Sequence, residues 1–286
     1  MKENIITNNW PVFEIKTIDE IERFFEILVT KRWVFRGQRA YATLFAPIDR
    51  PPLNGLARIQ KLYLEDQSIK KLVSSVKFPS DEIELQILGI DTNNCRLYIE
   101  KRISILMLLQ HYNCPTRLLD WSANPYIALY FAITQNYGFH DDEDGEVWCF
   151  DGYAYDNIFG PRQWPSNPEV YDSAGEFDNS IPSLFTEKGP KGDWFVMQAL
   201  NPKFHRLEHQ AGFFSVTSQF GIDHAIAIQR LFSNNIHYYC RCVIKSEFKP
   251  ELRTYLKRKG IWHGELFPDV AGIAHALRKD VFGLND

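Results

Sequence analysis

The densest run of unusual residue choices in this chain is LQHYNCPTRLLDWSANPYIALYFA, residues 109–132. It mixes apolar and aromatic side chains, which belong in a core, with polar groups whose burial without a partner would be costly. We therefore expect these polar groups to pair with one another or with a ligand. They are Gln110, His111, Thr116, Arg117, Asp120 and Asn124.

Two arrangements satisfy these groups. In the first, Arg117 and Asp120 form a salt bridge that holds the corner between two helices, while Gln110 caps loop carbonyls. In the second, the same side chains bind a ligand. The residue types allow both arrangements.

Local signals place the block between two helices. Apolar residues recur at helical spacing over residues 95–112, so we expect a long helix that delivers Gln110 to a loop. Downstream, Asn124 and Pro125 match an N-cap followed by proline in the first helical position. Ser122 is therefore predicted to precede a helix N-terminus.

Helices and strands mix along the rest of the chain without regular alternation. Thr17 and Glu20 have the capping-box spacing of a helix over residues 17–29, and WVFRGQ at 33–38 predicts a strand that ends near Arg36. We expect an α+β fold, a single domain over 1–286 with mixed or antiparallel sheets flanked by helices. The aperiodic tract 151–191 is predicted to be an insertion or a lid. Further strands are expected at 146–150, 193–198, 212–216 and 237–245, and further helices at 57–73 and 249–259.

Composition narrows the function classes. The formal net charge of −4 gives no basic excess that would attract nucleic acid, which is not indicated but not excluded. The five scattered cysteines have no metal-ligand spacing and are expected to be reduced thiols. The start MKENIITNNW lacks the apolar core of a secretory signal, and we expect a cytoplasmic protein with no membrane span and no metal. The phosphate-loop, dinucleotide-fold, zinc-protease and serine-hydrolase motifs are absent from the sequence.

The sequence resembles the FRG domain family, named for a Phe-Arg-Gly tripeptide that stands here as Phe35-Arg36-Gly37, followed by Gln38. The block from residue 110 to 132 is similar to the second motif of that family. Two later stretches, RLEHQAGFFSV at 206–216 and LFPDVAGIA at 266–274, also resemble it. The family is bacterial in its general distribution and is often discussed near phage-defence and toxin loci.

A more distant resemblance is to mono-ADP-ribosyltransferases of the Arg-Ser-Glu type. Phe35-Arg36-Gly37 looks like their first motif, and DWS at 120–122 with the helix that follows looks like their second. EHQ at 208–210, before GFFSV, occupies the place of the strand that bears the catalytic Glu. The resemblance implies an ADP-ribosyltransferase-like fold.

The same resemblance implies NAD as a substrate. Arg36 would clamp the pyrophosphate with its planar guanidinium, Ser122 would orient the nicotinamide ribose or the catalytic acid, and Trp121 or Tyr126 would pack on nicotinamide. The implied NAD-binding set is Arg36, Gly37, Gln38, Gln110, His111, Thr116, Arg117, Asp120, Trp121, Asn124 and Tyr126.

The third motif departs from the transferase pattern because Gln210 stands at the aligned position, with Glu208 two residues earlier on the same strand face. A neutral amide binds a ribose hydroxyl but cannot stabilise an oxocarbenium-like transition state as a carboxylate does. The implied catalytic set is therefore Glu208, Gln210 and Ser122. The plainer alternatives are a solvated Glu208 and an internal salt bridge from Arg36 to Asp120.

Two functions follow as expectations. The first is an NAD-binding, ADP-ribosyltransferase-like protein that modifies a macromolecular acceptor or hydrolyses NAD, acting as a toxin or a phage-defence effector. The second is a non-catalytic sensor module that binds a ligand or a protein partner through the same site. The acceptor and the oligomeric state are not specified by the sequence.

Overall fold

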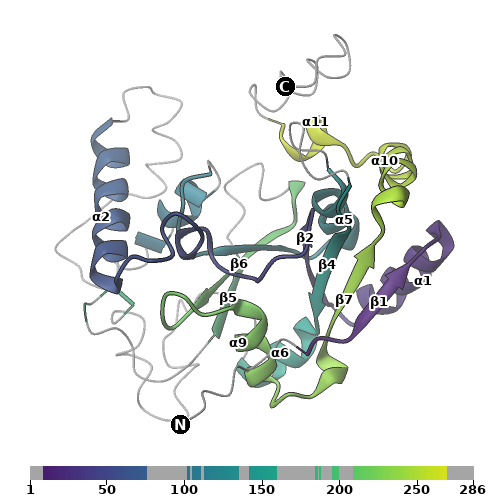
Figure 1. The fold of residues 1–286 in the computed structure, drawn as a ribbon, viewed down its shortest axis with the longest axis horizontal. Helices are drawn as coiled ribbons and strands as arrows, with labels where there is room; N and C mark the ends of the chain where they lie inside the picture. Colours follow the sequence, from purple (N-terminus) through teal and green to yellow (C-terminus); the bar gives the residue numbers. More distant parts are fainter. Residues whose placement is uncertain are drawn as a thin grey trace.

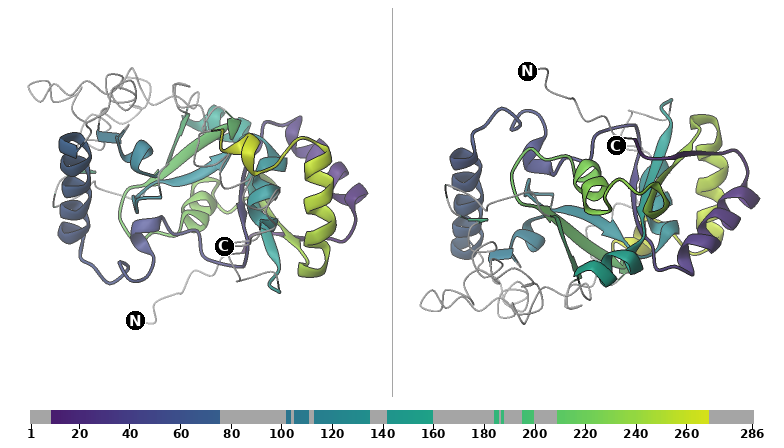
Figure 2. Two further views of the ribbon diagram at one scale, coloured as in Figure 1. Left: turned by 90° about the horizontal axis from the view of Figure 1, so that it is seen from above. Right: turned by 90° about the horizontal axis from the view of Figure 1, so that it is seen from below.

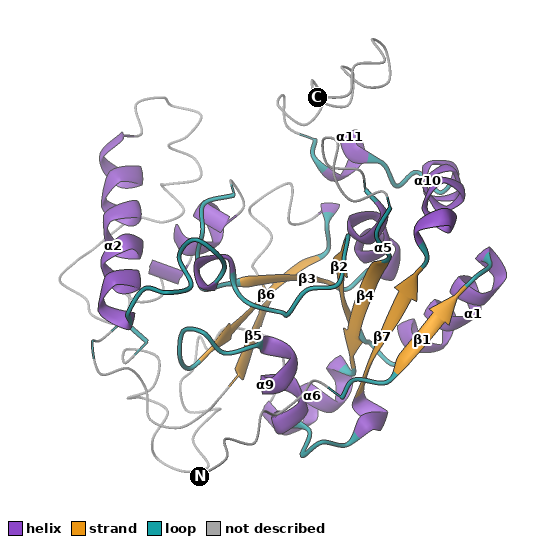
Figure 3. Cartoon of the chain, viewed as in Figure 1, coloured by secondary structure: helices purple, strands orange, loops and turns teal. Residues whose placement is uncertain are grey.

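A seven-stranded mixed sheet forms the centre of the computed structural model, which describes residues 9–75, 102–103, 105–110, 113–134, 142–159, 184–185, 187, 195–199 and 209–268 (Figures 1 and 3). The strand order is β1-β7-β4-β2-β3-β6-β5, with β1 and β7 parallel and the other neighbours antiparallel. The predicted α+β class with a mixed sheet is confirmed. The strands are β1 (Val12–Ile15), β2 (Val34–Gln38), β3 (Leu119–Ser122), β4 (Gly145–Phe150), β5 (Phe195–Ala199), β6 (Gly212–Thr217) and β7 (Tyr239–Ile244).

One face of the sheet is covered by α1 (Ile18–Val29), α5 (Pro125–Ile133) and α10 (Lys249–Arg258). Figure 2 shows α1 and α10 together at one end of the molecule and α2 (Arg58–Ser75) at the other. Thr17 caps α1 by accepting a hydrogen bond from the Glu20 amide, and Asn124 caps α5 by accepting one from the Tyr126 amide. Both predicted N-caps are confirmed.

The other face carries α6 (Gly152–Phe159) and α9 (His224–Leu231). Because side chains alternate along a strand, Val34 points to this core while its neighbour Phe35 points to the α5 core. Helix α6 corrects the prediction of an aperiodic tract from 151, since it is regular and buries Tyr155 completely. Most of the remaining tract, and with it the expected lid, lies outside the described residues.

A third cluster packs α2 and the helical residues 102–103 and 105–110 against β6. Glu65 of α2 is buried and binds the guanidinium of Arg117, whose Nε donates to Glu65 Oε1 at 2.9 Å and to Oε2 at 3.0 Å. Arg117 Nη1 also donates to the Leu184 carbonyl at 2.8 Å. The expected Arg117–Asp120 salt bridge is therefore wrong, because Glu65 arrives from a distant helix as the partner of Arg117.

Three findings concern membrane helices, metal ligands and cysteines. None of the described helices is both long and apolar enough to cross a membrane. Within the same residues, no three His, Cys, Asp or Glu side chains gather as a metal site would need. The four described cysteines, Cys114, Cys149, Cys240 and Cys242, are free thiols, as predicted.

Candidate functional site

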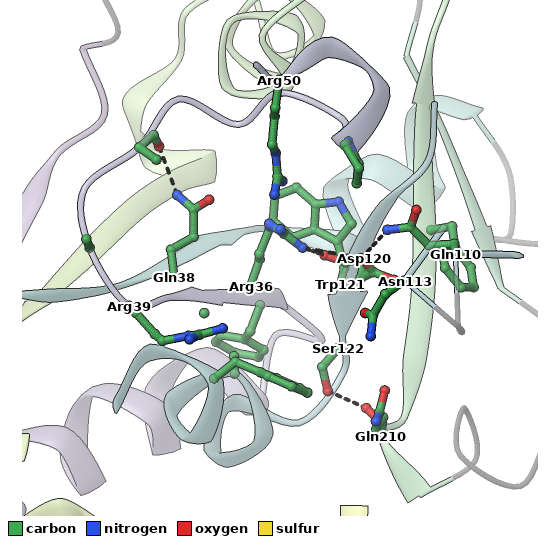
Figure 4. A pocket seen from close by; sticks show the side chains of 18 of the residues that line it. Arg36, Gln38, Arg39, Arg50, Gln110, Asn113, Asp120, Trp121, Ser122 and Gln210 are labelled. Atoms are coloured by element: carbon green, nitrogen blue, oxygen red, sulfur yellow. Dashed lines mark hydrogen bonds and ion pairs between the residues drawn. The ribbon is translucent and has the colours of Figure 1, made fainter. Parts of the chain in front are cut away.

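A cavity of about 680 Å³ lies where β2 meets β3, at the registered pair Phe35 and Ser122 (Figure 4). Residues of both strands line it, together with the loop after β2, the 110–114 corner and the turn before β6. Its volume falls within the range of about 300–1,000 Å³ that is usual for small-molecule sites. Among the described lining residues, the charged side chains are Arg36, Arg39, Arg50 and Asp120, and the amides are Gln38, Gln110, Asn113 and Gln210.

Arg36 follows Phe35, the β2 residue that is paired with Ser122, and its side chain reaches across to β3. Its Nη1 donates to the Asp120 carbonyl at 2.6 Å and lies 3.8 Å from Asp120 Oδ2. The Arg36 side chain is 13% exposed, whereas that of Asp120 is 51% exposed. The internal pairing of Arg36 with Asp120 is therefore present, and both groups line the cavity.

Burial lowers the pKa of the Arg36 guanidinium to about 10. The positive charge of Arg50 lowers this pKa further, while the Asp120 carboxylate opposes both effects. Burial also lowers the pKa of Arg50 and of Arg39 below the ordinary arginine value. The cavity thus holds cations that have lost much of their hydration.

A chain of hydrogen bonds fixes the Asp120 carboxylate. Gln110 Nε2 donates to Asp120 Oδ2 at 2.8 Å, and Thr116 Oγ1 donates to Gln110 Oε1 at 2.7 Å. The Leu118 amide donates to Thr116 Oγ1 at 3.1 Å. Gln110 therefore binds side chains, not the loop carbonyls that were expected, and Thr116 acts from outside the cavity by orienting Gln110.

The turn before β6, which contains Gln210, forms another part of the cavity wall. Ser122 Oγ donates to the Gln210 carbonyl at 2.7 Å and accepts from the Asn124 amide at 3.0 Å. Gln210 Nε2 donates to the Leu266 carbonyl at 3.1 Å. Arg36, Ser122 and Gln210, which lie far apart in the sequence, thus line one cavity.

The structure separates the predicted site residues into three groups. Those that line the cavity are Arg36, Gly37, Gln38, Gln110, Asp120, Trp121, Ser122 and Gln210. Those whose side chains act in the scaffold, outside the lining, are Thr116, Arg117, Asn124 and Tyr126. His111 and Glu208 lie outside the described residues.

The scaffold roles are specific. Asn124 is the cap of α5, and Tyr126 packs edge-on against Phe25 with ring centroids 5.3 Å apart. Lys259 Nζ lies 4.9 Å from the centroid of the Tyr126 ring. Tyr126 is thus part of the interface of α5 with α1 and α10, where it supports the helix behind the cavity.

Sequence reasoning missed Arg39 and Arg50. Arg39 directly follows the Phe-Arg-Gly-Gln run, and this position was a usable signal. Arg50 lies in a proline-rich loop, where its Nε donates to the Phe45 carbonyl at 3.0 Å. No local pattern marks it, because its place in the cavity depends on how the loop packs against β3.

Comparison with known proteins adds one finding. Residues 31–141 match the family model of the FRG domain. This segment contains β2, β3 and α5, and 17 of the 20 residues that line the cavity belong to it. No curated protein and no solved structure matches the chain. The match supports an FRG domain over residues 31–141.

Proposed function

We propose that this cavity binds NAD and that the protein transfers its ADP-ribose to a macromolecule or hydrolyses it. The observation that carries the proposal is that Arg36, Ser122 and Gln210 line one cavity. These residues stand, in the same order along the chain, at the three positions that resemble the motifs of mono-ADP-ribosyltransferases.

The chemistry of the lining suits a dinucleotide. Guanidinium groups bind pyrophosphate through paired N–H donors, and Arg36, Arg39 and Arg50 offer three such groups. Aromatic rings give apolar surface for a planar base, and Phe131, Phe214 and Phe267 are among the lining residues with Trp121. The amides of the lining supply donors and acceptors for ribose hydroxyls.

The reaction would break the bond between ribose C1′ and the nicotinamide nitrogen, and nicotinamide would leave with the bonding electrons. A nucleophile on the acceptor, or water, would form the new bond to C1′ and lose a proton. Glu208 is the carboxylate assigned to stabilise the positive ribose in this proposal. Ser122 is a positioning residue, because its hydroxyl already joins Gln210 to the start of α5. Roles as a toxin or a phage-defence effector belong to the same proposal.

A second function, a sensor module that binds its ligand without turnover, is favoured by one observation. Gln210 occupies the position of the catalytic Glu, and its amide is engaged with the Leu266 carbonyl. An uncharged side chain held in this way can hydrogen-bond a ligand and tie the turn before β6 to Leu266, but it cannot stabilise the positive charge of a transition state.

NAD consumption and the NAD-induced shift in Tm of the purified chain test both functions. The variants are Arg36→Ala and Glu208→Gln, with Arg258→Ala as the matched control, since Arg258 is an exposed arginine of α10 outside the cavity. For the enzyme, both variants lose turnover and Arg258→Ala keeps it. For the sensor, NAD raises Tm without being consumed, and Arg36→Ala alone removes the shift. If NAD neither shifts Tm nor is consumed, the NAD proposal is wrong.

A further inference from the structure

The charges around the cavity are unbalanced. Among the described lining residues there are three guanidinium groups and one carboxylate, that of Asp120. In Figure 4 the side chains of Arg36 and Arg50 extend toward each other beside Trp121. Two of their donors, Arg36 Nε and Arg50 Nη2, are buried and find no hydrogen-bond acceptor within the described part of the chain.

A buried donor without an acceptor destabilises the fold, and the free-energy penalty is largest when the donor belongs to a charged group. The Asp120 carboxylate balances this charge only in part, because its Oδ2 lies 3.8 Å from Arg36 Nη1 and its side chain is half exposed. The shorter contact of Arg36 is to the Asp120 carbonyl, which carries no net charge. Within the described residues, no anion accepts a hydrogen bond from either of these two buried donors.

We infer that Arg50 and Arg36 together form a phosphoryl subsite, and that Asp120 is an internal counter-ion that competes with the phosphoryl group for this pair. The inference rests on the proposed function only in using the same cavity. Its ligand is a phosphoryl group, which the pyrophosphate of a dinucleotide or free pyrophosphate would supply equally well.

The inference fixes the sign of a mutational effect. If the Asp120 carboxylate accepted hydrogen bonds from hydroxyl groups of the ligand, removing its charge would weaken binding. If the carboxylate instead repels the phosphoryl group and pairs with the arginines that would bind it, removing its charge strengthens binding. Asp120→Asn keeps the size of the side chain and a partner for Gln110, while it removes the negative charge.

Calorimetric titration of the full chain with inorganic pyrophosphate, at one fixed ionic strength, tests the subsite. We expect Asp120→Asn to bind pyrophosphate about tenfold more tightly than the parent chain, and Arg50→Gln to bind it about tenfold more weakly, each a difference of about 1.4 kcal/mol. The exposed Arg258→Ala variant is the control and should match the parent. Far-ultraviolet circular dichroism shows whether each variant is folded.

Unchanged or weaker binding by folded Asp120→Asn overturns the inference, and so does a parent chain that does not bind pyrophosphate. If Asp120→Asn does not fold, Arg50→Gln decides, because equal affinity in Arg50→Gln and Arg258→Ala rejects the subsite. Titration with NAD separates this result from the proposed function. If the chain binds pyrophosphate but not NAD, the subsite stands and the NAD proposal is wrong. If it binds NAD but not pyrophosphate, only the subsite is wrong.

Discussion

Gly37 lies so close to helix α5 that a Cβ atom built on it would stand 1.8 Å from the carbonyl oxygen of Ala128. Glycine at this position lets β2 and α5 touch backbone to backbone, which holds Arg36 at the cavity. Gly37→Ala forces the strand or the helix to move, and we expect it to lower the free energy of unfolding by about 3 kcal/mol. Urea denaturation monitored by tryptophan fluorescence measures this loss.

Gly55→Ala is the matched control for that substitution. A Cβ atom at Gly55 would meet nothing within 4 Å. Its effect on the free energy of unfolding should stay within about 0.5 kcal/mol. Equal losses in the two variants would show that the contact between Gly37 and Ala128 does not explain the glycine.

The buried pair of Glu65 and Arg117 makes the second prediction. Glu65→Gln removes the negative charge and leaves the guanidinium buried without its counter-charge, so we expect a loss of about 3–5 kcal/mol in the free energy of unfolding. Lys70→Ala is the control, because it breaks an ion pair with Asp66 in which the Lys70 side chain is 67% exposed. That exposed pair should contribute less than about 1 kcal/mol. Losses of similar size in both variants would contradict the assignment.

His224 predicts a pH dependence of stability. It is fully buried, its Nδ1 lies 2.8 Å from Ser215 Oγ, and burial lowers its pKa to about 3, with the charges of Arg36 and Arg50 acting in the same direction. Between its ordinary pKa of about 6.5 and this lowered value, the unfolded chain binds a proton that the folded chain does not. The contribution of His224 to stability should therefore be constant above pH 7 and fall as the pH decreases.

From pH 7 to pH 5.5 the contribution of His224 to this loss is about 1 kcal/mol. Urea denaturation of the parent chain and of His224→Asn at the two pH values isolates the contribution, since the variant has no group that titrates at this position. The free energy of unfolding of the variant should fall less over the same interval. Identical falls would mean that His224 does not cause the dependence.

Ser122 connects two parts of the cavity wall by donating to the Gln210 carbonyl and accepting from the Asn124 amide. Ser122→Ala removes both hydrogen bonds, and we expect it to cost about 1–2 kcal/mol of unfolding free energy. Thr254→Ala serves as the comparison, because the Thr254 hydroxyl makes an exposed bond to the Pro250 carbonyl of its own helix. Its measured loss should be below about 0.5 kcal/mol.

Local patterns were sufficient for much of the fold. Thr17 and Asn124 cap helices where the sequence predicts them, because an N-cap depends on a few neighbouring residues. Strand β1 escaped prediction, since three of its four residues are exposed and it shows no apolar alternation. Helix α6 was missed for a similar reason: it is short and lies in a tract with many turn-forming residues.

The site was predictable only where its residues stand within recognisable motifs. Arg36, Asp120 and Ser122 were found in this way, and the cavity brings them together. Arg50 was not found because no local pattern marks it, and Glu65 was not found because it meets Arg117 from 52 positions away. The roles assigned to Glu208 and His111 stay predictions, as both lie outside the described residues.

The parallel pairing of β1 with β7 affects folding during synthesis of the chain. Val12 is paired with Arg241, more than 200 positions further along the chain. At a synthesis rate of about 5–20 residues per second, β1 waits on the order of ten to fifty seconds for this partner to be made. Val12 and Phe13 are half exposed even in the finished sheet. The nascent chain therefore carries an unpaired apolar strand while the residues between β1 and β7 are made, and this edge of the sheet forms only when β7 has emerged.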